Sequence, residues 1–294
     1  MRPILPDAFR PRLSGFTLLE MILSIVIVAI IFGATLFFAY PMQQAGDITT
    51  RAELTDMADN ALQRMGRDVR LALPNSVRQT TTGTLPNLVY YVELIPLRTG
   101  GRYRVETSGA VCGGGTDELA FGAADGCFKS IGPIPDDTTV LASDFVVLNN
   151  YGEGFTGQSA YEAASTNRRQ VSAVTSATTV TYTPTTAFDR TLHDSPGRRF
   201  FIVTTPVSYV CDPVDRTLKR YSGYGFLAAQ PTTFGVGVPS ALVATDVSDC
   251  KMLYALNVAP KIGLLTLQLT LSRTVSTGTE NVSLYHAVHV NNIP

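Results

Sequence analysis

The sequence predicts an α+β protein in which one long N-terminal helix precedes a globular part built from an antiparallel β-sheet. Residues 16–40 form an apolar run, and residues 47–73 continue with apolar side chains at helical spacing. Beyond Pro74 the chain changes to short runs of β-branched and aromatic residues. Its 24 Gly and 17 Pro also favour short strands and turns over further helices.

The composition excludes several classes of protein. The chain has 294 residues and a net charge of -1, with 45% hydrophobic and 16% charged residues. Such a chain is too apolar to be disordered and carries no basic excess for binding nucleic acid. Its length allows one large or two modest domains with a sizeable core.

Residues 16–40 are long enough to cross a membrane. The stretch from Met21 to Ala39 would form a helix of about 29 Å, which matches a bilayer core of roughly 30 Å. Arg2, Arg10 and Arg12 precede the run, and no basic residue follows it immediately. This asymmetry predicts a single pass with a cytoplasmic N-terminus and a C-terminal domain on the outer side.

The small residues that could mark a cleavage site come before the apolar run rather than after it. An ordinary secretory signal ends its apolar core at such residues. Cleavage after Gly15 would remove residues 1–15 and leave Phe16 as the first residue of the membrane helix. Glu20 would then be the only charged side chain before Asp47. A carboxylate at the bilayer centre costs about 2.5 to 3.5 kcal/mol, so Glu20 needs a partner or a shallow position.

The junction resembles the processing site of type IV pilins and pseudopilins. It combines a basic leader and an unbroken apolar helix with the run Gly15, Phe16, Thr17, Leu18, Leu19 and Glu20. The resemblance implies that a prepilin peptidase cuts after Gly15 and methylates the amine of Phe16. It also implies that Glu20 faces the N-terminal amine of a neighbouring subunit. The alternative is an uncleaved signal anchor whose Glu20 reaches the cytoplasmic headgroups.

Residues 41–74 read as an amphipathic second half of the same helix. Its apolar positions recur at helical spacing, and Pro74 is expected to stop it. Pro41, with Gly46, is expected to kink or locally melt the helix where the two halves meet. A coiled coil is the weaker interpretation, because the stripe lasts under four heptads. The resemblance implies a lollipop-shaped pilin-like fold in which this half packs on the sheet formed by residues 75–294.

About ten short strands are expected after residue 74, with no second strong helix. A turn is expected at Thr99–Gly101, and an Asp212–Asp215 turn should join two β-rich runs. Leucines alternate with polar residues over 265–271, which predicts a strand with one buried face. That strand and residues 282–290 should form a hairpin that closes the sheet. The other candidates are 88–94, 102–105, 145–148, 171–174, 178–182, 200–210 and 218–224.

The four cysteines all lie in the part that the topology places outside. Two disulfides are expected there, because proteins outside the cytoplasm persist in an oxidising environment. Of the three connectivities, pairing of nearest neighbours is favoured, which joins Cys112 to Cys127 and Cys211 to Cys250. A zinc site is disfavoured because no C-x-x-C motif occurs.

No catalytic constellation is apparent, and no cofactor or metal is expected. His286 and His289 lie three residues apart on a predicted strand and therefore point to opposite faces. His193 and Asp194 lack a G-x-S-x-G nucleophile motif and are expected in a solvated loop. The paired aspartates at 212 and 215, and at 246 and 249, lack a dense calcium-binding pattern and are expected to form turns.

Further motifs are similar to those of MshO-type minor pilins of mannose-sensitive haemagglutinin (MSHA) pili. PilW-type minor pilins and J-type pseudopilins of type II secretion share the architecture. The resemblance implies a minor pilin that primes or caps a filament, with a prepilin peptidase, other minor and major pilins and an inner-membrane assembly platform as partners. The protein would start in the inner membrane, with a periplasmic domain, and move to the pilus surface. A J-type pseudopilin and a pilus-tip adhesin remain alternatives. The motifs are residues 61–65, 73–77, 100–104, 195–201, 206–211 and 220–224.

Overall fold

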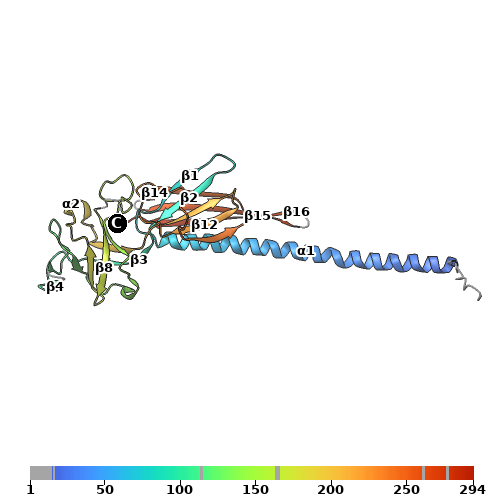
Figure 1. Ribbon diagram of the computed structural model, residues 1–294, viewed down its shortest axis with the longest axis horizontal. Coiled ribbons are helices and arrows are strands. Elements are labelled where there is room, and N and C mark those ends of the chain that lie inside the picture. Colours follow the sequence, from blue (N-terminus) through green and yellow to red (C-terminus); the bar gives the residue numbers. More distant parts are fainter. Residues whose placement is uncertain (1–14, 16, 113–114, 163–165, 260–261, 276–277) are drawn as a thin grey trace, which may run out of the picture.

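A computed structural model describes residues 15, 17–112, 115–162, 166–259, 262–275 and 278–294. The chain begins with one helix, α1 (Leu18–Arg70), and continues as a β part (Figure 1). With 53 residues, α1 is about 80 Å long. Its first half projects alone from one end of the molecule, and its second half lies along the sheets (Figure 1).

Helix α1 runs without a break past Pro41 and Gly46, so the expected local melting of the helix is wrong. Proline removes one intrahelical hydrogen bond, but its φ suits a helix, so the helix can continue past it. The helix ends at Arg70, and Leu71 caps it by donating its N–H to the carbonyl of Arg67. The end thus comes shortly before the predicted stop at Pro74.

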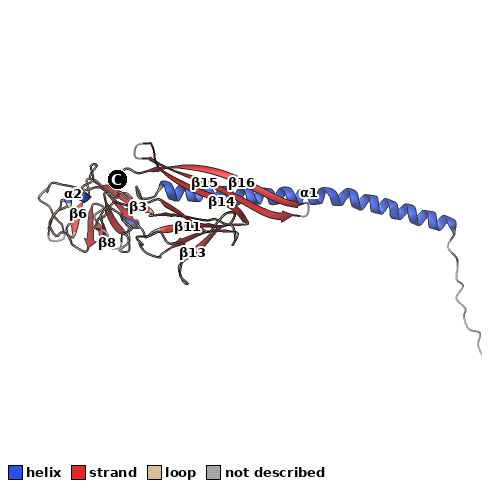
Figure 2. Cartoon of the chain, turned by 90° about the horizontal axis from the view of Figure 1, so that it is seen from above, coloured by secondary structure: helices blue, strands red, loops and turns tan. Residues whose placement is uncertain are grey.

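Two antiparallel sheets and the second half of α1 form a body that we call the trunk (Figure 2). The strand order of the first sheet is β1-β2-β11-β12-β13, and that of the second is β14-β15-β16. The strands of the first sheet are β1 (Arg78–Thr82), β2 (Val89–Leu94), β11 (Val207–Asp212), β12 (Thr217–Ser222) and β13 (Ser240–Thr245). Those of the second are β14 (Val247–Ala259), β15 (Ile262–Val275) and β16 (Gly278–Asn291).

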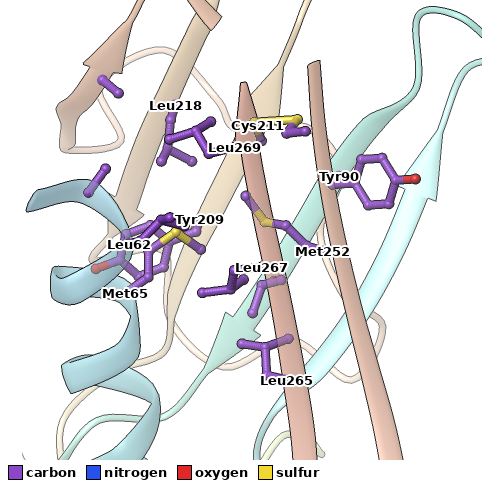
Figure 3. Close-up of a cluster of buried hydrophobic side chains, with 14 of the residues drawn as sticks. Leu62, Met65, Tyr90, Tyr209, Cys211, Leu218, Met252, Leu265, Leu267 and Leu269 are labelled. Atoms are coloured by element: carbon purple, nitrogen blue, oxygen red, sulfur yellow. A yellow bond between two sulfur atoms is a disulfide. The ribbon is translucent and has the colours of Figure 1, made fainter. Parts of the chain in front are cut away.

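The trunk core lies between α1 and both sheets (Figure 3). Leu62 and Met65 from α1 meet Tyr209 from β11 and Leu267 from β15 there. The predicted alternation over residues 265–271 is confirmed, because all four leucines are buried. The terminal hairpin is also confirmed, but it pairs with β14 in a sheet of its own and does not close the first sheet.

A second β body, which we call the lobe, is inserted into the trunk between β2 and β11. Its six-stranded sheet has the order β3-β10-β7-β8-β9-β6 and its own core. The sheet strands are β3 (Leu97–Arg102), β6 (Cys127–Lys129), β7 (Phe145–Leu148), β8 (Arg168–Thr175), β9 (Thr179–Thr183) and β10 (Arg199–Val203). Smaller elements are β4 (Val111–Cys112), β5 (Gly115–Thr116), η1 (Asp137–Thr139) and α2 (Arg190–His193).

The lobe lies at the end of the trunk opposite to the projecting helix (Figure 1). Because β2 and β11 pair directly, the chain leaves and re-enters the trunk sheet at adjacent strands. The Thr204 N–H donates to the carbonyl of Pro96 at 3.0 Å and ties the two connecting segments together. The β part thus has a trunk core and a lobe core, and a third buried apolar cluster, which includes Leu73, Ile95, Val147 and Tyr161, lies at their junction, which we call the neck.

One predicted turn and two predicted strands are wrong. Thr99–Gly101 lies inside β3 and is no turn. A Cβ on Gly101 would come within 2.9 Å of the Phe200 ring, so the glycine permits close strand contact. The run over residues 200–210 splits into β10 and β11, which belong to different sheets. The predicted strands at 145–148 and 171–174 are confirmed within β7 and β8, and the one at 178–182 corresponds to β9. The predicted strand at 102–105 is wrong, because β3 ends at Arg102.

A buried ionic network joins the two bodies at the neck. The Arg78 Nε donates to Glu93 Oε2 at 2.6 Å, and both side chains are almost fully buried, at 6% and 0% exposure. Arg78 also pairs with Glu153 of the lobe, and its guanidinium carbon lies 3.7 Å from the centroid of the Tyr161 ring. Burial raises the pKa of Glu93, and the Tyr224 hydroxyl donates to its second oxygen at 2.8 Å. The network fixes the lobe against the trunk through charges that cannot be left unpaired.

Candidate assembly helix and processing site

The expected processing site lies at the exposed start of α1. A Cβ on Gly15 would meet no atom within 4 Å, so a peptidase has open space around that residue. Phe16, the expected methylated residue, and leader residues 1–14 lie outside the described part of the chain. Thr17 is the N-cap, and its Oγ1 accepts a hydrogen bond from the N–H of Glu20 at 3.3 Å.

Glu20 lies in the first turn of α1 and its side chain is exposed. A carboxylate there interacts favourably with the positive end of the helix dipole. The residues around it in the sequence are apolar except Thr17 and Ser24, and the projecting half of α1 stands clear of the sheets (Figure 2). Glu20 is thus available to a group on another molecule.

The first half of α1 can cross a membrane by length and composition. The apolar segment Leu18–Leu36 has 19 residues, and none of it is buried within the chain. A helix of that length spans about 28 Å. An unbroken apolar surface of this size needs lipid or other apolar helices to cover it.

The second half of α1 is amphipathic and is docked on the trunk, as expected. Its buried side contacts β15 and β16. Gly66 was not singled out from the sequence, yet it allows α1 to lie close to β16. A Cβ at this position would lie 2.8 Å from His286 Nε2 of β16. The buried apolar residues are Leu54, Ala58, Ala61, Leu62, Met65 and Val69.

The exposed side of the docked half carries a polarised charge pattern, which we call the stripe. Three acidic residues come first and three arginines follow, and each arginine lies 11 residues after one of the acids. Eleven residues are about three helical turns, so each acid and its arginine lie on nearly the same face of α1. The members are Glu53, Asp56 and Asp59, then Arg64, Arg67 and Arg70, and all six are exposed.

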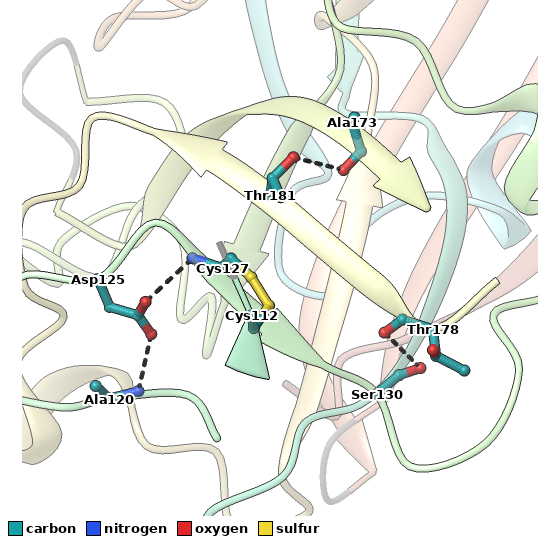
Figure 4. Close-up of a disulfide and its surroundings, with 8 residues drawn as sticks. All are labelled: Cys112, Ala120, Asp125, Cys127, Ser130, Ala173, Thr178 and Thr181. Carbon is teal, nitrogen blue, oxygen red and sulfur yellow. Dashed lines mark hydrogen bonds between the residues drawn. A yellow bond between two sulfur atoms is a disulfide. The ribbon is translucent and has the colours of Figure 1, made fainter. Parts of the chain in front are cut away.

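The structure places both cysteine pairs at disulfide distance. Cys112 and Cys127 lie in the lobe with Cα atoms 5.9 Å apart (Figure 4). Asp125 orders this site by accepting the N–H of Cys127 at 3.2 Å (Figure 4). Cys211 of β11 and Cys250 of β14, with Cα atoms 6.4 Å apart, link the two trunk sheets. These pairs match the favoured connectivity.

The candidate catalytic pair is part of the lobe's packing. His193 is buried in α2, which corrects the expectation of a solvated loop. Its Nδ1 accepts the Asp189 N–H at 3.0 Å, and burial lowers the pKa of the ring. Asp194 instead accepts the Tyr103 hydroxyl at 2.7 Å. The histidine and the aspartate thus serve different structural contacts, and no serine within the described residues joins them in a triad.

Other candidate sites also have structural roles. Asp212 accepts the N–H groups of Val214 and Asp215, which confirms the turn at that position. Asp246 forms an ion pair with Arg273 at 2.8 Å. Within the described residues, no three His, Cys, Asp or Glu side chains gather as metal ligands.

Comparison with known families supports the assignment of the N-terminal segment. The model of the prokaryotic N-terminal methylation motif matches residues 10–36. No match was found among curated proteins or solved structures. The motif indicates a type IV pilin-like or pseudopilin-like protein, and it favours a structural subunit over an enzyme. It implies contact with a prepilin peptidase and other pilins, and the apolar helix fits a single-pass anchor.

Proposed function

We propose that the protein is a minor pilin of an MSHA-type type IV pilus that acts in a priming or tip complex. A prepilin peptidase cuts after Gly15 and methylates Phe16. The mature chain waits in the inner membrane, with its N-terminus cytoplasmic and residues 75–294 in the periplasm. An assembly platform then moves it into the filament, where other minor and major pilins surround it.

The two halves of α1 carry the proposal. The half at Leu18–Leu36 has no cover within the chain, whereas the half after Arg51 is packed on the trunk. One continuous helix therefore carries the folded trunk on its second half and exposes an apolar surface on its first half. That surface can be covered either by lipid or by other apolar helices. Transfer from membrane to filament replaces lipid by neighbouring helices, without unfolding the trunk.

Glu20 supplies a reason for ordered association. Its carboxylate lies at the exposed start of α1, four residues along the chain from the residue whose amine cleavage would create. A charge in an apolar surrounding is costly unless it is paired. A neighbouring N-terminal amine would satisfy Glu20, and Glu20 would satisfy that amine, so the pair favours contact between subunits over isolation in lipid.

The stripe favours lateral packing of parallel helices. Membrane anchoring makes neighbouring helices parallel, and parallel helices at the same height would place acids against acids. A shift of 11 residues, or about 16 Å, would bring the acids of one such stripe opposite the arginines of another. The pattern thus favours staggered neighbours, as in a helical filament.

The lobe supports a place at or near the tip. It lies at the end of the molecule farthest from the projecting helix, and it adds a second β body beyond the trunk (Figure 1). Each further layer of subunits along a shaft would have to accommodate that bulk. A subunit at the tip has no neighbour beyond it, so the lobe can extend freely.

The decisive test compares Glu20→Ala with the parent in cells that carry the complete pilus system. Mass spectrometry should find mature chains that begin with methylated Phe16 in both. Glu20→Ala should be at least tenfold depleted from sheared filaments, whereas Glu106→Ala, an exposed acid of the lobe, should be incorporated normally. Chains that retain residues 2–15, or normal incorporation of Glu20→Ala, would contradict the proposal.

A further inference from the structure

A cleft of about 750 Å³ opens where the trunk meets the lobe. Gln79 of β1 and Tyr254 of β14 line it from the trunk, and Arg199 of β10 lines it from the lobe. None of its lining residues belongs to α1, so helix-mediated assembly leaves the cleft without a role. Binding clefts commonly form at such junctions between domains.

The lobe wall presents an aromatic loop, residues 151–155. Tyr151 and Phe155 are 38% and 50% exposed, and their ring centroids lie 5.5 Å apart. Both rings line the cleft and contribute only part of their area to packing. The face of an aromatic ring carries negative charge and attracts weakly positive C–H groups. The two ring planes are tilted by 46°, so the rings form an angled platform whose faces can contact the C–H groups of a ligand.

The aromatic loop is held rigidly against the trunk. Gly152 has φ +85°, and a Cβ there would lie 2.5 Å from the Asn75 carbonyl oxygen. The Asn75 amide donates to the carbonyl of Asn150 at 2.8 Å, at the base of the loop. Farther along, the Tyr161 hydroxyl donates to the carbonyl of Ser76 at 2.8 Å. The platform is therefore formed before a ligand arrives, which lowers the entropic cost of binding.

One arginine of the cleft, Arg199, is free to bind an anion. Three charged side chains line it, and two of them, Arg78 and Glu153, form an ion pair. Arg199 is only partly exposed, and its guanidinium has no hydrogen-bond or ion-pair partner among the described residues. Arginine binds carboxylates through two parallel hydrogen bonds. The side-chain amide of Gln79 is likewise unoccupied and can serve a hydroxyl.

We propose that this cleft binds an acidic saccharide, with a pyranose ring against Tyr151 and Phe155 and its carboxylate on Arg199. A sugar combines the three features that the cleft offers: a C–H face, hydroxyls and, when acidic, a carboxylate. An acidic peptide would satisfy Arg199 but has no ring face for the platform. The proposal goes beyond the assembly role, and it does not depend on incorporation into a filament.

The test uses the full chain in lipid nanodiscs and isothermal titration calorimetry. The probes are sialyllactose, trigalacturonate, lactose and a Glu-rich hexapeptide. At least one acidic sugar should bind more than tenfold tighter than lactose. No binding of either acidic sugar, equal affinity for lactose, or tighter binding of the peptide would overturn the proposal.

Variants then locate the site. Arg199→Gln should lower the affinity for the acidic sugar about tenfold, which equals 1.4 kcal/mol, towards that of lactose. Tyr151→Ala combined with Phe155→Ala should weaken both sugars. Arg190→Gln and Tyr285→Ala replace similar residues away from the cleft and should change neither. Circular dichroism checks the fold of each variant. A well-folded Arg199→Gln protein with unchanged affinity and selectivity would refute the assigned carboxylate contact.

Discussion

The neck between trunk and lobe allows a quantitative test of the buried ionic network. Replacing Arg78 by Met removes the partner of Glu93, whose side chain has 0% exposure. Loss of one member of a buried ion pair costs about 3 to 5 kcal/mol, because the other charge stays buried without compensation. For a chain of this size, the loss corresponds to a fall in Tm of about 10 °C.

The dependence on pH identifies the cause. Burial already raises the pKa of Glu93, and Arg78 opposes that rise, so Arg78→Met should raise the pKa further. A carboxyl whose pKa is raised in the folded state destabilises that state above the pKa of the unfolded chain. The unfolded chain is common to both proteins, so the deficit relative to the parent should grow as pH rises through the folded pKa of Glu93 in the parent, which burial already raises above its ordinary value, and become constant above the folded pKa of the variant.

The assay is urea unfolding of the full chain in detergent micelles between pH 4 and 8. Tyrosine emission reports the transition, because the chain has 12 Tyr and no Trp. Arg51→Met is the control: its ion pair with Glu280 is 68% and 27% exposed, so it should cost at most about 1 kcal/mol. Adding Glu93→Gln to Arg78→Met should restore much of the stability. Equal losses in the two arginine variants, or a deficit independent of pH, would refute the reasoning.

Three further predictions concern the trunk and the assembly surface. Replacing both Cys211 and Cys250 by Ala should cost about 4 kcal/mol in calorimetry, because the disulfide closes a loop with a sequence separation of 39; a loss below 1 kcal/mol would show that the cross-link is dispensable. Leu62→Ala should lower the free energy of unfolding by about 2 to 5 kcal/mol, and a wild-type urea midpoint would mean that α1 is not docked there. Arg67→Glu should reduce recovery in sheared filaments, because the reversed charge would face the acids of a staggered neighbour; recovery equal to that of the parent would contradict the staggered packing of the stripe.

The local features of the fold could be predicted because they depend on periodicity. The 11 residues from Leu54 to Arg64 already show the alternation of buried and exposed positions that docks α1. In β15, the alternating leucines similarly fix one buried face. Both signals arise within a few turns or residues of chain, where sequence spacing determines geometry.

The partition of the β part could not be predicted in the same way. Strand assignment gives no information on which strands pair, and β2 joins β11 across more than a hundred intervening residues. Gly100 and Gly101 show the difficulty well, because the signal for a turn and the signal for close contact with an aromatic ring are the same residue type. Only the tertiary partner, Phe200, distinguishes the two.

The candidate sites show the same difference between local and long-range signals. Gly15 and Glu20 belong to a local motif and could be recognised from adjacent residues. The cleft draws Gln79, Arg199 and Tyr254 from three distant segments, and no spacing in the sequence relates them. Its rigidity depends on the positive φ of Gly152, which is one of many glycines until its neighbour Asn75 is known.

The hydrogen bond between Thr204 and Pro96 has a consequence for how such chains diversify. The entry and exit of the inserted body are close enough to touch, so a few residues could bridge them and leave the remaining sheet pairing intact. Genetic exchange at this point could then replace the lobe and leave α1 and the trunk unchanged. The surface of the lobe could then vary in sequence while α1, which carries the methylation motif, and the trunk stay the same.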